Sequence, residues 1–182
     1  LVNDYGLEYT ADHAKRIKHI QDLYNDEYID NKAMEGQQAV DKDELMNEIN
    51  KLDVRAKAIC LVNLITANRP SEMVTIRIND FDLKQGTVKV KMHKQKEVFV
   101  KKLTLETVNA VKEYISKFDL QDTDHLVGKV DRHGNYTDAE VSDVAYRKMC
   151  HKWLKVAPYT LRKTQVTSMH TKGADLATIA KQ

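Results

Sequence analysis

The spacing of apolar and polar residues predicts a chain built mainly of helices. Apolar residues recur at helical spacing over 8–26, and again from about Asp41 onward. Residues 54–68 are apolar on nearly every side, which is typical of a helix at the centre of a domain. The 6 glycines and 2 prolines of the chain disfavour an all-β fold with many tight turns.

A lysine-rich segment in the middle of the chain alternates as β-strands do. Residues 87–92 alternate apolar residues with lysine, and a second strand is predicted over 97–103, so residues 93–96 form the tip of a hairpin. Seven lysines but a single acidic residue, Glu97, lie from Lys84 to Lys102. Such a hairpin is either a solvated face or a basic probe for a nucleic-acid groove, and both interpretations stay open at this point.

Two further helices are predicted after the hairpin, over 104–118 and 137–152. Thr137 and Glu140 have the spacing of a capping box, in which each side chain bonds the backbone N–H of the other end of the first turn. We therefore expect the second helix to begin at Thr137.

Two arginines stand close to proline-marked breaks. Arg69 precedes Pro70, which is suited to start a short helix over 71–76. Arg162 is expected in the first turn of a helix that runs to about Thr171, where backbone N–H groups favour an anion. Each arginine is therefore a candidate ligand for an oxyanion such as phosphate.

Arg69 also has a purely structural interpretation. An arginine in an apolar segment is costly to bury unless it is paired, and either Glu72 or Asp80 is a possible partner. The salt bridge and the phosphate ligand both remain open on this evidence.

Composition says more about the cellular environment of the protein than about its function. The 182 residues carry a net charge of only +2, so an anion-binding surface requires local clustering. Cys60 and Cys150 lie in apolar helical patterns without metal-ligand spacing, and we expect reduced core residues, a cytoplasmic (nucleoid-associated) location and no metal. Neither a membrane-spanning run nor a signal peptide is apparent.

Four short patterns, in the same order, resemble the catalytic domain of the tyrosine recombinases, the phage-integrase family. They cover the segment of the first catalytic arginine, the turn before the hairpin, the box with the second arginine and a Gly-x-Asp-Leu helix start: 64–73, 79–83, 158–164 and 173–176. The resemblance extends over 40–182. It implies a DNA breaking–rejoining enzyme fold, mainly α with a small antiparallel sheet (α+β).

The resemblance also implies domain boundaries. Residues 40–182 are similar to the recombinase catalytic domain, C-terminally truncated. Residues 1–39 are expected to form an N-terminal helix and linker, or the end of a core-binding domain.

Roles for individual residues follow from the same resemblance. Arg69 and Arg162 would hold the scissile phosphate, and Lys94, or alternatively Lys96, would act as general acid. Tyr159 stands where the family's box has a histidine and would be confined to hydrogen bonding. Expected DNA contacts are the basic residues of the hairpin and the box: Lys89, Lys91, His93, Lys96 and Lys163.

The activity implied is site-specific cutting and rejoining of DNA through a 3′-phosphotyrosine, in a phage or other mobile element, without cofactor or metal. The expected partner is double-stranded DNA, bound by a homotetramer that is a monomer in isolation, with no membrane. None of the 8 tyrosines matches the family's nucleophile, which is expected beyond Gln182, so the chain alone should be inactive. Alternatives are a non-catalytic DNA-binding accessory module and a helical protein-interaction domain.

Overall fold

The computed structural model describes residues 12–20, 38–92, 97–175 and 178–179. The chain divides into two compact units, residues 1–36 and 37–182. In the first unit, residues 12–20 are helical, as expected, and Ile17 and Ile20 are exposed. The rest of the helix predicted over 8–26 lies outside the described residues.

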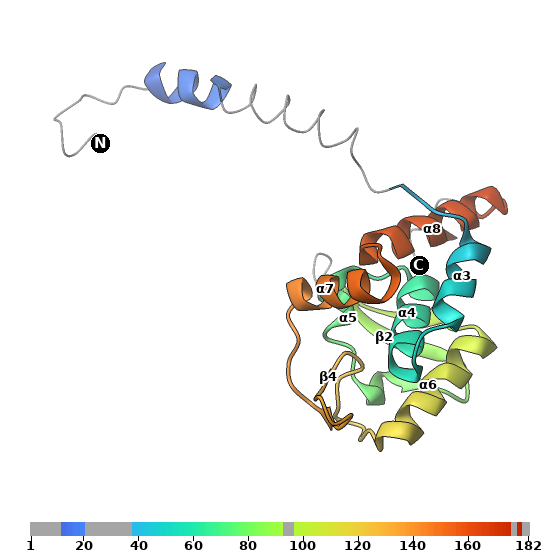
Figure 1. Ribbon diagram of the computed structural model, residues 1–182. Helices are drawn as coiled ribbons and strands as arrows, with labels where there is room; N and C mark the ends of the chain where they lie inside the picture. Colours follow the sequence, from blue (N-terminus) through green and yellow to red (C-terminus); the bar gives the residue numbers. More distant parts are fainter. Residues whose placement is uncertain (1–11, 21–37, 93–96, 176–177, 180–182) are drawn as a thin grey trace, which may run out of the picture. The chain divides into compact units, whose positions relative to one another are not determined.

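The second unit is organised around helix α4, Val54–Thr66. Every residue from Ala58 to Thr66 is buried, as the all-round apolar pattern predicts. Figure 1 shows α4 surrounded by other helices, and it packs against α3, α6 and α8. The helices around it are α3 (Lys42–Asn50), α5 (Pro70–Met73), α6 (Leu105–Phe118), α7 (Asp143–Leu154) and α8 (Pro158–Thr171).

The predicted hairpin is present. Strands β1 (Phe81–Asp82), β2 (Thr87–Met92) and β3 (Glu97–Lys102) form an antiparallel sheet in that order, and the 3₁₀ helix η1 (Ile78–Asp80) precedes it. Thr87 pairs with Lys102 at one end of the β2–β3 ladder, and Met92 pairs with Glu97 at the other. The architecture is therefore mainly helical with small antiparallel sheets.

One predicted helix start is wrong. Thr137 lies in a short strand, β5 (Tyr136–Thr137), which pairs with β4 (Lys129–Val130), and α7 begins only at Asp143. The turn between β4 and β5 is closed by Asp131, whose Oδ1 accepts from two backbone N–H groups beyond it. Ser142 is the actual N-cap, because its Oγ accepts from the backbone N of Ala145 at 3.2 Å.

The helices that follow the two proline breaks also differ from the prediction. Helix α5 covers only Pro70–Met73, shorter than the predicted 71–76. Helix α8 begins at Pro158, so Arg162 is its fifth residue and does not lie in the first turn. Its chemistry therefore rests on where its side chain reaches, and not on the free N–H groups of a helix start.

The bounds of two other helix predictions agree with the structure, because α6 covers Leu105–Phe118 and α8 ends at Thr171. Thr104 caps α6, and Gly173 follows α8 with a φ of 82°, a left-handed conformation that favours glycine. Cys60 and Cys150 are free and buried, and the neighbouring Cys150 and burial raise the pKa of the Cys60 thiol. Among the described residues, no helix is long and apolar enough to cross a membrane.

A candidate anion site at the turn between α4 and α5

The turn between α4 and α5 places the first arginine. Ala67 ends α4 in the left-handed conformation, with a φ of 50°. The backbone is extended at Arg69. Pro70 then starts α5, because the fixed φ of proline suits the first helical position. Arg69 is held by its neighbours along the chain, and its side chain keeps 35% of its surface exposed.

Glu72 is the partner of Arg69. Its carboxylate, 1% exposed, accepts from the backbone N of Arg69 at 2.8 Å and from its Nη1 at 3.0 Å. Asp80, the other partner considered from sequence, accepts instead from the backbone N of Arg77. The salt bridge considered for Arg69 is therefore present. It uses one of the five N–H donors of the Arg69 guanidinium, and the Arg69 side chain is partly exposed.

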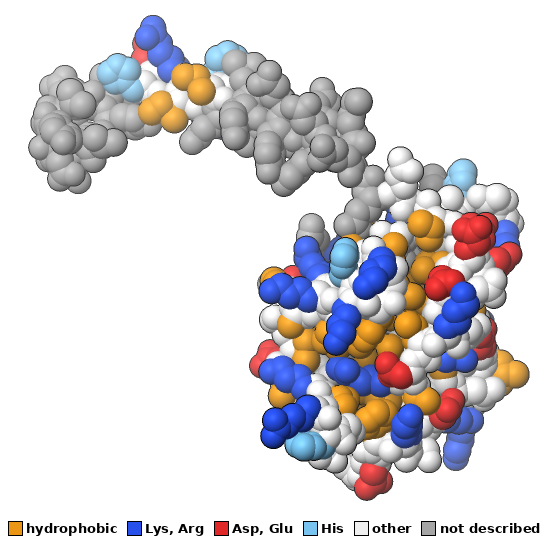
Figure 2. All heavy atoms as spheres, viewed as in Figure 1, with side chains coloured by type: hydrophobic (Ala, Val, Ile, Leu, Met, Phe, Trp, Pro, Cys, Tyr) orange, Lys and Arg blue, Asp and Glu red, His pale blue; other side chains and the backbone are white. Residues whose placement is uncertain are grey.

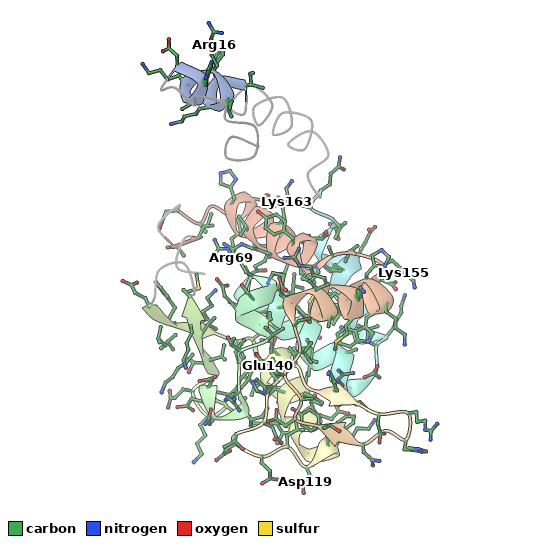
Figure 3. The ribbon with its side chains drawn as sticks, turned by 90° about the vertical axis from the view of Figure 1, so that its left-hand side faces the viewer. Arg16, Arg69, Asp119, Glu140, Lys155 and Lys163 are labelled. Atoms are coloured by element: carbon green, nitrogen blue, oxygen red, sulfur yellow. The ribbon has the colours of Figure 1, made fainter. Side chains whose placement is uncertain are left out.

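Helix α8 brings the second arginine to the same turn. Arg162 Nη1 donates to the carbonyl oxygen of Ala67, 95 residues earlier in the chain. Burial lowers the pKa of Arg162, and the charge of Arg69 lowers it further. In Figure 3, Arg69 lies where the α4–α5 segment meets the α8 helix, which also carries Lys163. The fold therefore brings Arg69 and Arg162 together.

A third cation, which no sequence motif marks, lies beneath the turn. Lys101 of β3 is 2% exposed. Its Nζ donates to the carbonyl oxygen of Thr66 at 2.7 Å and to Asn68 Oδ1 at 2.8 Å. Burial lowers the pKa of Lys101 to about 8; Glu72 raises it, whereas Arg162 and Arg69 lower it.

The strand pattern contained a signal for Lys101. It pairs with the buried Val88 across the β2–β3 ladder, so both side chains occupy the same face of the sheet. On β3 the expected polarity is inverted, because Val98 and Val100 are 58% and 62% exposed while Lys101 points inward. Extending the alternation across the tip would have placed a lysine in the core.

The charges of this cluster do not balance. Among the described residues, the three cations Arg69, Arg162 and Lys101 gather around the carboxylate of Glu72. Poorly hydrated cations in excess of their counter-charges attract an anion, and guanidinium groups match the geometry of a phosphate. We call these four residues the cationic cluster.

The remaining predicted site residues fall into two groups. Tyr159 is 55% exposed on α8, close enough to Arg162 for its charge to affect the pKa of that arginine. Lys163 is exposed on α8, and Lys89 and Lys91 are exposed on β2. Residues 93–96, which include His93, Lys94 and Lys96, lie outside the described residues, so both candidates for the general acid are structurally undescribed.

The overall charge of the chain is small, at +2. On the face seen in Figure 2, Lys and Arg side chains are interspersed with Asp and Glu and with apolar surface. Attraction for an anion must therefore come from local groups such as the cationic cluster. Within the described ranges, no group of three or more His, Cys, Asp or Glu side chains is placed to hold a metal ion.

Comparison with known proteins decides the family. The model of the phage integrase family matches residues 37–182, which is most of the chain. The chain belongs to the phage integrase family. The tyrosine recombinase XerC of Thermodesulfovibrio yellowstonii is 29% identical to this integrase-family chain over 136 residues, covering 69% of the chain and 44% of XerC.

Solved structures show the same fold. The crystal structure of XerA recombinase has a TM-score of 0.66 at 24% identity, covering 79% of this chain and 54% of XerA. The Tn1549 transposon integrase, in complex with a circular intermediate DNA, has a TM-score of 0.61 at 14% identity, covering 80% and 57%. This integrase-family chain thus spans about half the length of the relatives it matches.

Proposed function

We propose that this integrase-family chain provides the phosphate-binding part of a site-specific recombinase. Arg69 and Arg162 would hold the non-bridging oxygens of the scissile phosphate in double-stranded DNA. The observation that carries the proposal is the convergence of two arginines from distant segments on one turn, with more positive charge than Glu72 balances. XerH and the Tn1549 integrase, which share the fold, were solved with DNA.

The reaction proposed is transfer of a phosphodiester to a tyrosine and back. A tyrosine oxygen attacks phosphorus, the bond from phosphorus to the 5′ oxygen breaks, and a 3′-phosphotyrosine remains. Lys94, or alternatively Lys96, would protonate the leaving 5′ oxygen. The arginines would bind the oxygens more tightly as negative charge grows, and loss of one such donor lowers the rate by roughly 10²–10³.

The proposal extends to the parts around the cluster. Residues 40–182 would form the catalytic domain and residues 1–39 an N-terminal helix and linker. The hairpin and α8 would contact DNA through Lys89, Lys91, His93, Lys96 and Lys163, four protomers would act together on DNA, and the lysine-rich hairpin favours a mobile element as the source. Tyr159 would hydrogen-bond the phosphate or Arg162.

DNA binding provides the first test. A fluorescent duplex is titrated with the wild-type chain and with Arg162→Gln at several salt concentrations. A hydrogen bond to a charged group contributes about 1.5–3 kcal/mol, so we expect at least a tenfold loss of affinity. Arg132→Gln, on the exposed turn between β4 and β5, is the matched control. Equal losses of DNA affinity in the two variants, or wild-type affinity that does not change with salt concentration, would count against the proposal.

Covalent trapping tests the chemistry. The chain is incubated with a nicked suicide duplex, and we expect no protein–DNA adduct from its 8 tyrosines. Among those described, Tyr114 and Tyr146 are fully buried and the hydroxyl of Tyr136 donates to the carbonyl of His125. A protein that continues this chain with a tyrosine-bearing segment should form the adduct, and Arg162→Gln should suppress it. An adduct on any of the 8 tyrosines would refute the assignment.

A further inference from the structure

Lys101 stands out among the buried groups because the proposed reaction does not use it. It is a lysine with 2% exposure on the inner face of a sheet, where it pairs with the buried Val88 and its strand neighbour Phe99 pairs with the buried Val90. A buried ammonium is costly unless it is well bonded, and an apolar residue of similar volume is usually at least as stabilising. Its presence therefore calls for a role that a hydrophobic residue cannot fill.

The hydrogen bonds that Lys101 donates to Thr66 and Asn68 lead to the arginine-bearing turn. Thr66 and Asn68, which accept from its Nζ, flank Ala67, the residue whose carbonyl accepts from Arg162. Strand β3 and helix α8 are thus both tied to the three residues immediately before Arg69. A displacement of this turn would move Arg69 relative to Arg162.

The charge of Lys101 also interacts with the charged groups around the arginine-bearing turn. Among the described residues, the charged groups that act on it include Glu72 from α5, Arg162 from α8 and Arg69 from the turn. Two of these are cations that disfavour its protonated form, so an anion held by the arginines would favour that form. Conversely, the protonated form of Lys101 must favour the anion by the same free energy, because linkage between two sites is reciprocal.

We propose that Lys101 is a positioning residue for the phosphate site, holding the α4–α5 turn and adding a third positive charge beneath it. This inference rests on the proposed function, because it takes the cationic cluster to be the place where the scissile phosphate binds. It assigns the buried lysine a part separate from that of Lys94 or Lys96.

Sulfate serves as the probe, because its charge stays constant between pH 6.5 and 9.5. Sulfate binding to the full chain is measured across this range by thermal shift, with chloride at equal ionic strength as reference. If bound sulfate raises the pKa of Lys101 by about one unit, affinity falls about tenfold as pH rises through 8 and beyond. Lys101→Met should bind sulfate about tenfold more weakly than wild type at pH 7 and lose this pH dependence.

Lys101→Arg is the variant that separates charge from shape. Its guanidinium stays protonated, so it should keep sulfate affinity near the wild-type value at pH 7 and show no decline near pH 8. Circular dichroism and the fluorescence of Trp153, the single tryptophan, report whether each variant is folded. If Lys101→Arg does not fold, the wild-type pH profile compared with Lys101→Met still decides the question.

Each outcome has a clear meaning. Absence of sulfate binding in wild type, or a folded Lys101→Met with wild-type affinity and pH dependence, overturns the inference. Sulfate binding that depends on Lys101, combined with no binding of duplex DNA, leaves the anion site in place and rejects the proposed function. Dependence of both ligands on Lys101 supports both.

Discussion

Two lysines of one small sheet, Lys89 and Lys101, meet opposite environments. Lys89 lies exposed on the outer face of β2, opposite Val100, whereas Lys101 lies buried on the inner face of β3, opposite Val88. The outer lysine is exposed to solvent, so the stability of the fold places little demand on its identity. The inner one is desolvated and bonded to one particular turn, so position in the pleat determines whether a lysine is general surface charge or part of a site.

Removing the counter-charge of the inner face should have the largest effect. Glu72 is 1% exposed and supplies the carboxylate of the cationic cluster. Because loss of one partner leaves buried charge uncompensated, Glu72→Gln should lower the free energy of unfolding by about 3–5 kcal/mol. Urea denaturation followed by circular dichroism measures this.

The matched control for that substitution is Glu113→Gln on the exposed face of α6. A surface substitution of this kind should change the free energy of unfolding by less than about 0.5 kcal/mol. If the two variants lose similar amounts of stability, the cationic cluster is as hydrated as the surface. The contrast between the buried and the exposed charges would then be wrong.

The pH dependence of stability should separate Lys101 from the outer lysines next. Its pKa is about 8 in the folded chain and 10.5 ordinarily, so between these values the unfolded chain binds more protons. The unfavourable contribution of the buried charge is fully present below pH 8 and is relieved as pH rises toward 10.5. Relative to Lys101→Met, wild type should gain up to about 1.4 kcal/mol per pH unit in this interval.

Urea titrations of both proteins at pH 7, 8, 9 and 9.5 provide the measurement. Lys89→Met serves as the control, because an exposed lysine has nearly the same surroundings in the folded and unfolded chains. A constant difference between wild type and Lys101→Met across the interval would show that Lys101 keeps its ordinary pKa.

Some elements of this fold can be predicted from the sequence and others cannot. The central helix and the β2–β3 ladder are predictable because a period of 3.6 or 2 is repeated over many residues. The start of α7 is not, since the turn closed by Asp131 competes locally with the apparent capping box at Thr137. Helix propensity alone does not reveal which of the two wins.

The residues of the cationic cluster also differ in whether the sequence predicts them. Arg69 and Arg162 are recognisable from short motifs, although only tertiary packing brings α8 to the carbonyl of Ala67. Lys101 has no motif, and its inward orientation depends on the register across residues 93–96. A shift of one residue in register would move every β3 side chain to the other face, so composition could not identify it.

Tyr159 should give a smaller effect than the cluster itself. It is 55% exposed near Arg162, and its hydroxyl is proposed to bond phosphate or that arginine. Tyr159→Phe should weaken duplex binding by about 0.5–1.5 kcal/mol, which is roughly two- to tenfold, without changing stability. Anisotropy titrations against wild type measure it, and unchanged affinity would assign the ring a packing role alone.

The outer lysines should matter least for stability and should affect DNA binding in a different way. Lys89 and Lys91 are exposed on β2, so replacing both with glutamine should change the free energy of unfolding by less than about 0.5 kcal/mol each. If they contact DNA phosphates, the slope of log affinity against log salt should become shallower by about 1 for each lysine lost. Lys117→Gln, at the exposed end of α6, is the matched control. An unchanged slope in the double variant would confine DNA contact to α8 and the cationic cluster, whereas a large loss of stability would show that the outer face of the sheet is not the interchangeable surface that its exposure implies.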